Sequence, residues 1–302
     1  MLKIGVMGLG NIAQKAYLPT MAGMQDEYEW HLTTRNEKKG KALAARYGFT
    51  HLHQTLDELI AVHPAAVFVH TPTATHPAII RALLNAGIHV YVDKPVATDP
   101  AVVRDLYGLA ASKNLLLTCG FNRRFAPFSL ALKAMPDKQQ ITAEKTRVHA
   151  QQESAAALWD LMIHPLDTAL WLADGDAATT AVHVRSDHAG NLQQAYYTAD
   201  TGECRVSAVT NMDAAANLEE VTVQAVGGRK RSIDLLQLQT QTSAGSLLQH
   251  RPDWEKVLET RGFAPLTRAF LDAVSGKGPN PVSPESAIAS HEACAELVAA
   301  LQ

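Results

Sequence analysis

The sequence predicts an α/β fold in which an N-terminal doubly wound parallel sheet is followed by an α+β domain with a largely antiparallel sheet. Three observations lead to this prediction. Short apolar runs alternate with helix-like segments over residues 1–120, a glycine-rich turn follows the first apolar run, and several extended segments follow one another without helices after residue 180. Because 302 residues exceed most single hydrophobic cores, we expect two domains, 1–120 and 121–302.

The first domain is predicted to alternate strictly between strands and helices. Strands are expected at 2–8, 29–34, 50–55, 65–71, 88–93 and 115–120, and helices at 11–24, 37–47, 57–62, 76–86 and 100–113. Pro19 should kink or end the first helix, since proline cannot donate a helical hydrogen bond. Strands separated by helices pair in parallel through right-handed crossovers. Their near-continuous apolar character indicates that both faces of the sheet are covered.

The second domain has a different pattern. A strand is expected at 141–151 and a helix within 156–173, followed by extended segments at 180–186, 192–199, 204–211, 218–227 and 231–240. The basic stretch at 227–232 is interpreted as a charged turn between strands. Runs of strands without helices favour antiparallel pairing. Two further helices, 264–276 and 283–302, complete the chain.

Composition excludes several classes of function. Hydrophobic residues make up 47% of the chain and charged residues 19%, with a net charge of −3, which is typical of a globular protein and gives no support to a nucleic-acid-binding or membrane-binding surface. The cysteines, Cys119, Cys204 and Cys294, show no metal-ligand spacing and no disulfide framework. We therefore expect a cytoplasmic protein with reduced thiols, no metal, no signal peptide and no membrane span.

The glycine-rich turn is the first candidate binding site. Residues 8–13, Gly-Leu-Gly-Asn-Ile-Ala, fit the dinucleotide pattern G-x-G-x-x-G/A between a strand and a helix. Gly8 permits a tight turn, Gly10 lets backbone approach a pyrophosphate, and Ala13 lets the helix pack on the sheet. Asn11 and Ile12 open that helix, whose N-terminus attracts phosphate. The pattern predicts a Rossmann domain that binds NAD(H) or NADP(H).

The end of the second strand addresses the choice between these two cofactors. An acid normally stands there and binds the adenosine ribose, but this chain has Thr34, Arg35 and Asn36. A guanidinium donates charge-assisted hydrogen bonds to phosphate, and Lys38 and Lys39 follow one turn later. We therefore favour NADP(H), while NAD(H) remains the alternative. In that alternative, Arg35 and the lysines belong to a solvated helix start, or Arg35 stacks on adenine.

Two further segments carry residues suited to catalysis. Asp93, Lys94 and Pro95 follow the fifth strand, at the sheet edge where ligands bind in doubly wound folds. Asp160 and His164 stand four residues apart in a helical segment, which places them on one helix face. A lysine at that edge of the sheet can approach a bound nicotinamide.

At this point the whole chain resembles the Gfo/Idh/MocA family of NAD(P)-dependent oxidoreductases, and within it the MviM-type oxidoreductases of enterobacteria. The resemblance rests on the glycine motif, on "HTPTATHPAI" with Thr71, Pro72 and His76, and on "AGIHVYVDKPVATDP" (86–100). It also rests on "GFNRRFAP" (120–127) and on the D-x-x-x-H of Asp160 and His164.

The resemblance implies an oxidoreductase that transfers hydride between nicotinamide and a C–OH or C=O group of a sugar-like, polyol or carbonyl compound. It implies that Lys94 and His164 assist this transfer and that Asp160 orients the substrate or His164. The cofactor would contact Thr71, Pro72, His76, Asp93 and Lys94. The substrate would contact Asn122, Arg123 and Arg124 besides Asp160 and His164. The open face of the second sheet would form a homodimer or homotetramer.

Three departures from the family pattern bear on these expectations. Asp93 replaces the usual glutamate before the lysine, Leu158 and Trp159 are bulkier than the usual small residues, and Pro165 follows His164 and should place it at a kink. The bulky pair keeps a second function open, a non-catalytic NADP(H)-binding redox sensor or partner protein. Most of the 13 histidines, His51, His53 and His63 among them, are interpreted as incidental.

Overall fold

The structure is a computed structural model that describes residues 1–301. The chain divides into two compact units. The first unit consists of residues 1–120 and 263–284, and the second of residues 121–262 together with the segment that begins at Glu285. The expected boundary after Gly120 therefore separates the units, but residues 263–284 do not belong to the second unit as we expected. They pack with the first.

The first unit contains a six-stranded parallel sheet with the strand order β3-β2-β1-β4-β5-β6, as predicted for a Rossmann fold. Its strands are β1 (Leu2–Met7), β2 (Tyr28–Thr33), β3 (His51–His53), β4 (Ala66–Val69), β5 (His89–Val92) and β6 (Leu117–Cys119). The order reverses between β1 and β4, and this is where such sheets bind ligands beyond the carboxyl ends of their strands.

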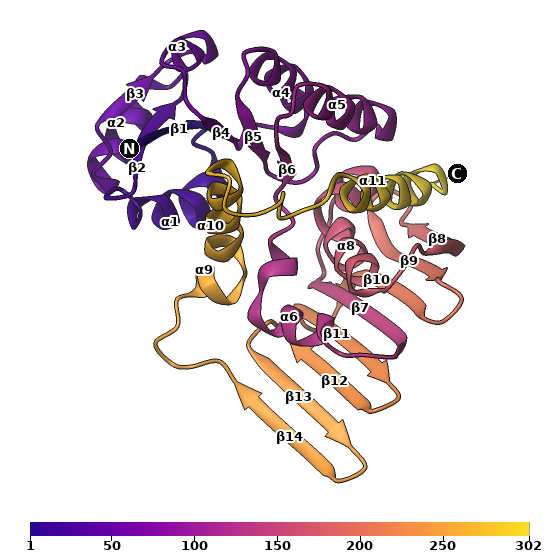
Figure 1. Ribbon diagram of the computed structural model, residues 1–302. Coiled ribbons are helices and arrows are strands. Elements are labelled where there is room, and N and C mark those ends of the chain that lie inside the picture. The colour runs from indigo at the N-terminus through magenta and orange to yellow at the C-terminus, as the bar shows by residue number, and fades with distance from the viewer. Residues whose placement is uncertain (302) are drawn as a thin grey trace. The chain divides into compact units, whose positions relative to one another are not determined.

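Helices cover both faces of this sheet (Figure 1). One face carries α1 (Leu18–Ala22), α2 (Glu37–Tyr47) and α10 (Phe263–Val274), and the other carries α3 (Leu56–Ala61), α4 (His76–Asn85) and α5 (Pro100–Ser112). A short 3-10 helix, η2 (Thr73–Thr75), precedes α4. Phe270 of α10 packs on Phe68 and Tyr91, with ring centroids 5.2 Å and 5.5 Å apart. Residues 263–284 thus complete the core of the first unit.

The first helix does not end at Pro19. It continues to Ala22 because a π-helical turn, η1 (Ala13–Tyr17), precedes the proline. In this turn the N–H of Leu18 donates to the carbonyl of Ala13, five residues back. The wider turn shifts the hydrogen-bond ladder just where Pro19 lacks a donor. The same arrangement occurs before Pro165, where Ile163 donates to the carbonyl of Leu158 at the end of η4 (Leu158–Met162).

The second unit contains an eight-stranded mixed sheet with the order β14-β13-β12-β11-β7-β10-β9-β8. Every pair is antiparallel except β7 with β10, so the sheet is largely antiparallel as predicted. The strands are β7 (Lys138–Val148), β8 (Ala178–Ser186), β9 (Leu192–Asp200), β10 (Arg205–Ala214), β11 (Leu218–Ala225), β12 (Gly228–Ile233), β13 (Gln237–Thr242) and β14 (Gly245–His250).

The helices of the second unit are mostly short. They are η3 (Asn122–Phe125), α6 (Pro127–Lys133), α7 (Ser154–Ala157), η4, α8 (Ile163–Leu172), α9 (Val257–Thr260) and α11 (Pro284–Ala299). The buried residues of β10 alternate along the strand at Val206, Ala208, Thr210 and Met212, which indicates that one face of the sheet is packed against helices. Among the described residues, no helix is both long and apolar enough to cross a membrane.

Two expectations for the second sheet are wrong. The basic stretch 227–232 is not a turn, because residues 228–233 form β12. The segment 231–240 is not one strand but the end of β12, a tight turn and the start of β13. Asp234 and Leu235 have positive φ angles of 51° and 62°, as in the type I′ turns of hairpins. Leucine is rare in that conformation, so Leu235, which is followed by Leu236, gave no sign of a turn in the sequence. The strand β14 was not predicted from the sequence.

Candidate functional site

The glycine-rich turn has the backbone geometry that its sequence predicts. Gly8 adopts a φ of +95°, and a Cβ atom there would lie 2.9 Å from Thr71 Cγ2 and 3.0 Å from the His70 carbonyl carbon. Gly10 has a different role, since its nearest neighbour for an added Cβ is the His70 carbonyl oxygen at 3.7 Å. Gly8 is required by the fold itself, whereas Gly10 leaves open space above the turn.

The helix after this turn is oriented by packing and by one side chain that the sequence analysis missed. Ala13 is completely buried, whereas Asn11 is exposed. The side-chain amide of Gln14 donates to the carbonyls of Leu9 (2.9 Å) and Gly10 (3.1 Å). The carbonyls of the turn are thus held back toward the helix, which fits a turn whose N–H groups face a phosphate.

The end of β2 places the predicted selectivity residues at the start of α2. Thr34 is half-buried and accepts a hydrogen bond from the Asn36 N–H at 3.3 Å. Asn36 caps α2 by accepting from the Lys39 N–H at 2.9 Å. Arg35 is exposed. Glu37 follows the cap, but its carboxylate pairs with Lys41 at 2.6 Å. The first acid after β2 therefore forms an ion pair within α2.

His76 joins the turn after β4 to the segment after β5. It is buried, and its ring nitrogens lie 2.8 Å from the Thr71 carbonyl oxygen and 2.9 Å from the Pro95 carbonyl oxygen. Thr71 in turn lies against Gly8. The Lys94–Pro95 peptide bond is cis, and Lys94 is half-buried. The structure thus brings the glycine turn, Thr71 and Lys94 to one edge of the first unit.

A buried hydrogen-bonded group lies beneath Asp93. The Tyr17 hydroxyl donates to Asp93 Oδ1 at 3.2 Å and lies 2.9 Å from the Tyr91 hydroxyl. Burial raises the pKa of Tyr17 well above its usual value, so this hydroxyl keeps its proton and donates. Burial also raises the pKa of Asp93, although Lys94 and the Tyr17 hydroxyl act in the opposite direction. Tyr17, which also contacts Tyr91, therefore positions the acid that precedes Lys94.

His70 completes this group, and its place there was not predicted from the sequence. Its ring stacks on Tyr17 with centroids 3.9 Å apart, and neither ring nitrogen has a hydrogen-bond partner within residues 1–301. Burial lowers the pKa of His70 to about 3, so the ring is neutral. No local pattern could have identified Tyr17, His70 and Tyr91 as neighbours, because they come from three separate elements of the sheet and its first helix.

In the second unit, two of the residues proposed to contact substrate are engaged with protein groups. Asn122 is buried and donates to the Arg261 carbonyl at 2.7 Å. Arg123 makes two hydrogen bonds to the Glu219 carboxylate, at 2.8 Å and 3.1 Å, and Lys145 donates to the same carboxylate at 2.6 Å. Burial alone would raise the pKa of Glu219, but Arg123 and Lys145 outweigh it and hold the pKa well below its usual range.

Arg124 forms a second buried ion pair. Its guanidinium donates to Asp167 at 2.5 Å and 3.1 Å, and Ser290 donates to the same carboxylate at 2.8 Å. These contacts join η3, α8 and α11. Arg124 and Asp167 are both almost fully buried, so this arginine supports the packing of the second unit.

Asp160 and His164 lie on neighbouring turns of one helical segment. Asp160 is exposed and belongs to η4, whereas His164 is half-buried and belongs to the first turn of α8. The expected kink takes the form of the π-helical turn before His164, and His164 itself is helical. A π-helical turn is wider than an α-helical turn, and this one places Asp160 one turn before His164 along the same helical segment. Such turns are frequent at functional sites.

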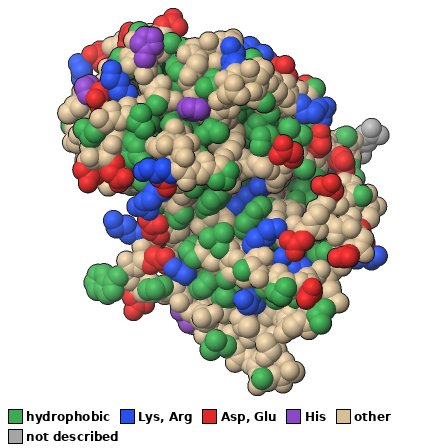
Figure 2. Space-filling view, viewed as in Figure 1, with side chains coloured by type: hydrophobic (Ala, Val, Ile, Leu, Met, Phe, Trp, Pro, Cys, Tyr) green, Lys and Arg blue, Asp and Glu red, His purple; other side chains and the backbone are tan. Residues whose placement is uncertain are grey.

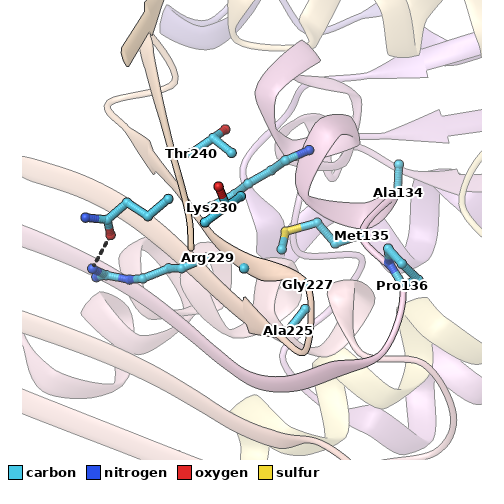
Figure 3. A pocket seen from close by; sticks show the side chains of 11 residues that line it. Ala134, Met135, Pro136, Ala225, Gly227, Arg229, Lys230 and Thr240 are labelled. Carbon is cyan, nitrogen blue, oxygen red and sulfur yellow. Dashed lines mark hydrogen bonds between the residues drawn. The ribbon is translucent and has the colours of Figure 1, made fainter. Parts of the chain in front are cut away.

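A separate cavity lies in the outer part of the second unit (Figure 3). Its volume is about 210 Å³, and Met135, Arg229, Lys230 and Thr240 are among its lining residues. The Arg229 guanidinium donates to the Gln241 side chain at 3.1 Å. None of the residues that line this cavity is among the predicted site residues.

Comparison with known proteins covers both units. A family model described as "Oxidoreductase family, NAD-binding Rossmann fold" matches residues 2–121, and a "YceM-like, C-terminal domain" model matches residues 127–243. A Salmonella typhimurium protein designated an oxidoreductase, YceM, is 33% identical over 296 residues, which is 95% of this chain and 92% of that protein. A crystal structure of a dehydrogenase (MviM) from Clostridium difficile is 28% identical, with a TM-score of 0.92 and 99% of both chains covered.

More distant proteins share the fold, and their names give a substrate or a bound cofactor for each of them. A UDP-N-acetylglucosamine 3-dehydrogenase from Acidithiobacillus ferrooxidans is 27% identical over 58% of this chain and 55% of that protein. Structures at 21% and 19% identity, with TM-scores of 0.82 and 0.79, hold NAD in one case and NADP in the other. The first is GenD2, and the second is KijD10, a 3-ketoreductase from Actinomadura kijaniata. The aligned regions cover 94% of each of these proteins, and they cover 99% of this chain for GenD2 and 96% for KijD10.

Proposed function

Because this chain belongs to the Gfo/Idh/MocA family of oxidoreductases, we propose that it is an NADP(H)-dependent dehydrogenase or reductase of a small sugar-like, polyol or carbonyl compound. The observation that carries the proposal is the connection made by His76. It ties the segment of Lys94 to the turn of Thr71, which lies against Gly8. A candidate acid–base residue and a candidate phosphate-binding turn therefore share one edge of the sheet.

The glycine turn and the end of β2 are proposed to hold the cofactor. The backbone of Gly8–Ala13 would bind the pyrophosphate at the N-terminus of the following helix. Thr34 and Arg35 would bind the 2′-phosphate. Residues 34–36 include no acid that would repel it, and Glu37, the next residue, pairs with Lys41. When bound, the nicotinamide accepts or supplies a hydride.

The residues of this chain are proposed to move the matching proton. During oxidation the substrate carbon loses a hydride, and its hydroxyl loses a proton to Lys94 or His164, which leaves a carbonyl. In the reverse direction the same residue returns the proton to the carbonyl oxygen. Positioned proton transfer of this kind contributes about 10²–10⁴-fold to rate. The relatives that are named as acting on sugar nucleotides or as ketoreductases support this substrate class.

The alternative of a non-catalytic sensor is weaker. It rested on the bulk of Leu158 and Trp159, but both side chains are buried in the second unit. Trp159 packs near His291 with ring centroids 6.0 Å apart. Their size is therefore explained by core packing. Cytoplasmic location and assembly into a homodimer or homotetramer are proposed along with the enzymatic function.

Cofactor titration tests the cofactor assignment. We expect NADPH to bind at least tenfold more tightly than NADH, which corresponds to about 1.4 kcal/mol, when binding is followed by fluorescence. Arg35→Ala should weaken NADPH binding and leave NADH binding unchanged. Arg46→Ala is the matched control, because it removes an exposed cation from the other end of α2. Equal binding of NADH and NADPH by the unaltered protein would refute the assignment.

A substitution at Lys94 separates the enzyme from the sensor. A panel of sugars, polyols and their keto forms is first screened with NADP⁺ and NADPH to find a turned-over substrate. Lys94→Met should then abolish turnover and retain NADPH affinity, whereas Lys277→Met, at an exposed lysine of the first unit, should change neither. Undiminished turnover in Lys94→Met would show that Lys94 is not the acid–base residue, and absence of turnover across the panel with tight NADPH binding would favour the sensor.

A further inference from the structure

Three histidines and a glutamate meet at one edge of the first sheet, away from the glycine turn. Glu29 and His31 come from β2, and His51 and His53 from β3, the edge strand. His31 pairs with His51 in the parallel register. Alternate residues of a strand point to the same face, so all four side chains project on one side. The expectation that His51 and His53 are incidental does not fit this arrangement.

The four side chains lie on the face covered by α3. Gly5 pairs with His31, and a Cβ atom on Gly5 would meet Leu59 of α3 at 3.0 Å. Histidine side chains reach the surface over β3 and α3 in Figure 2. The cluster is therefore anchored on its inner side, where His31 is 3% exposed, and open to solvent at His51.

The distances within the cluster are short. His31 Nε2 lies 2.8 Å and His51 Nε2 3.8 Å from Glu29 Oε1, and ligand atoms of Glu29, His31 and His51 all lie within 4.8 Å of one another. The rings of His31 and His51 are stacked, with centroids 4.5 Å apart. Two imidazole nitrogens and a carboxylate oxygen around a tetrahedral Zn²⁺ lie roughly 3.4 Å from one another, given metal–ligand bonds of about 2.1 Å. The present distances are close to these values, but the ring planes of His31 and His51 are only 14° apart, so one ring must rotate for both nitrogen lone pairs to point at a single ion.

We propose that Glu29, His31 and His51 bind a first-row divalent cation of the zinc type, with water in the remaining position. Two histidines and a carboxylate form a ligand set that zinc takes in proteins, whereas hard cations such as Mg²⁺ prefer oxygen ligands. The site would join the edge strand β3 to β2. It does not depend on the proposed oxidoreductase function.

His53 supports the proposed ligand set, because it is placed to act as the outer hydrogen-bond partner of His31. His31 Nδ1 lies 2.9 Å from His53 Nε2, so His53 can accept the Nδ1 proton once the metal replaces the proton on His31 Nε2. Ligating histidines commonly have such an outer partner. Lys3 stands opposite Glu29 in the register, but its ammonium group is directed to the Val62 carbonyl, to which it donates at 3.3 Å.

Zinc binding by the full chain, prepared without a histidine tag and stripped with a chelator, tests the proposal. Equilibrium dialysis with metal analysis should give one Zn²⁺ per chain, and Zn²⁺ should raise Tm by about 2 °C or more. His51→Ala and Glu29→Gln should each weaken binding at least tenfold, or about 1.4 kcal/mol. His188→Ala, at an exposed histidine of the second unit, is the matched control.

The variants are chosen so that folding does not obscure the outcome. His51 is exposed and Glu29 is partly exposed, so both variants should retain the circular dichroism spectrum of the unaltered protein, whereas the buried His31 is left intact. A zinc-soaked crystal should show an anomalous peak between Glu29, His31 and His51. The proposal fails if the unaltered protein binds no Zn²⁺, if both variants bind it as tightly as His188→Ala does, or if Mg²⁺ binds as well as Zn²⁺.

Discussion

At the scale of single residues, Gly8 and Gly10 show two different reasons for a glycine. Gly8→Ala should destabilise the fold by about 1–3 kcal/mol, because its positive φ and close neighbours exclude a side chain. Gly10→Ala should change the free energy of unfolding by no more than about 0.5 kcal/mol, since its Cβ meets nothing closer than 3.7 Å. It should nevertheless lower NADPH affinity at least tenfold, because the methyl group fills the space above the turn.

Thermal unfolding and NADPH titration of both variants measure this contrast. A Gly10→Ala protein that binds NADPH normally would show that the pyrophosphate does not approach this turn. A Gly8→Ala protein of unchanged Tm would show that the turn relaxes freely and that glycine is not needed there.

Asp93 gives a prediction about pH. Its pKa is raised in the folded protein, chiefly by burial, so over the interval between its unfolded and folded pKa values the folded state binds more protons than the unfolded state. Stability is therefore lost as pH rises through that interval. Asp93→Asn has no titratable group at this position. The free energy of unfolding of the variant, relative to that of the unaltered protein, should therefore increase as pH rises from about 4.

Urea unfolding of the two proteins across pH 3–8 gives the difference curve, in which the other carboxylates cancel. A constant difference across that range would mean that the Asp93 pKa is not raised. Lower turnover of Asp93→Asn in the same preparation would indicate that the charge, although costly to the fold, is needed beside Lys94.

At the scale of elements, the ion pairs around Glu219 join η3, β7 and β11. Glu219→Gln leaves the charges of Arg123 and Lys145 buried without a carboxylate, which should cost about 3–5 kcal/mol. Asp213→Asn is the comparison, because it breaks the ion pair of Asp213 with the exposed His149 and should change stability little. Urea unfolding measures both. Equal effects would show that solvent reaches Glu219 and screens its partners.

The regular elements of the first unit could be predicted because their signals are local. A run such as 65–71 needs only its own apolar residues to indicate a buried strand, and the alternation with helices indicates parallel pairing. The turn at Asp234–Leu235 was missed because an apolar leucine occupies a conformation that usually takes glycine or asparagine. Its φ is tolerated since Leu235 is buried and Asp234 accepts a hydrogen bond from the Glu219 N–H at 2.9 Å.

The candidate site was predictable in part for the same reason. The motif Gly8–Ala13 and the segment 93–95 are contiguous in sequence. Tyr17, His70 and Tyr91 contact one another only through the fold, and the partner of Arg123 lies 96 residues away. The signal that could have identified the zinc-type cluster was present, since Glu-x-His on one strand and His-x-His on the next repeat with the period of a strand.

At the scale of the whole molecule, the chain passes between the two units more than once. Residues 263–284 return to the first unit, and the segment from Glu285 belongs to the second. A sequence gives no local sign of this return, because α10 has the amphipathic pattern of any core-facing helix. Only the structure reveals that α10 packs on the first sheet, through the contacts of Phe270 with Phe68 and Tyr91.

The proposed assembly makes a prediction about the outer part of the second sheet. The edge strand β14 exposes Leu247 and Leu248, and Trp254, a few residues later, is 98% exposed. An apolar edge strand favours pairing with another chain. The resemblance to the family implies that a second copy of this chain covers the open face of the sheet, and we expect that contact to extend to β14. Light scattering after gel filtration should therefore give the mass of a dimer or tetramer.

Substitutions on the exposed apolar residues test where the chains meet. Leu247→Glu and Trp254→Ser should shift the measured mass toward that of the monomer, whereas Leu130→Glu, at an exposed leucine of α6, should not. A monomeric unaltered protein, or assembly that survives both substitutions, would place the interface elsewhere or exclude it.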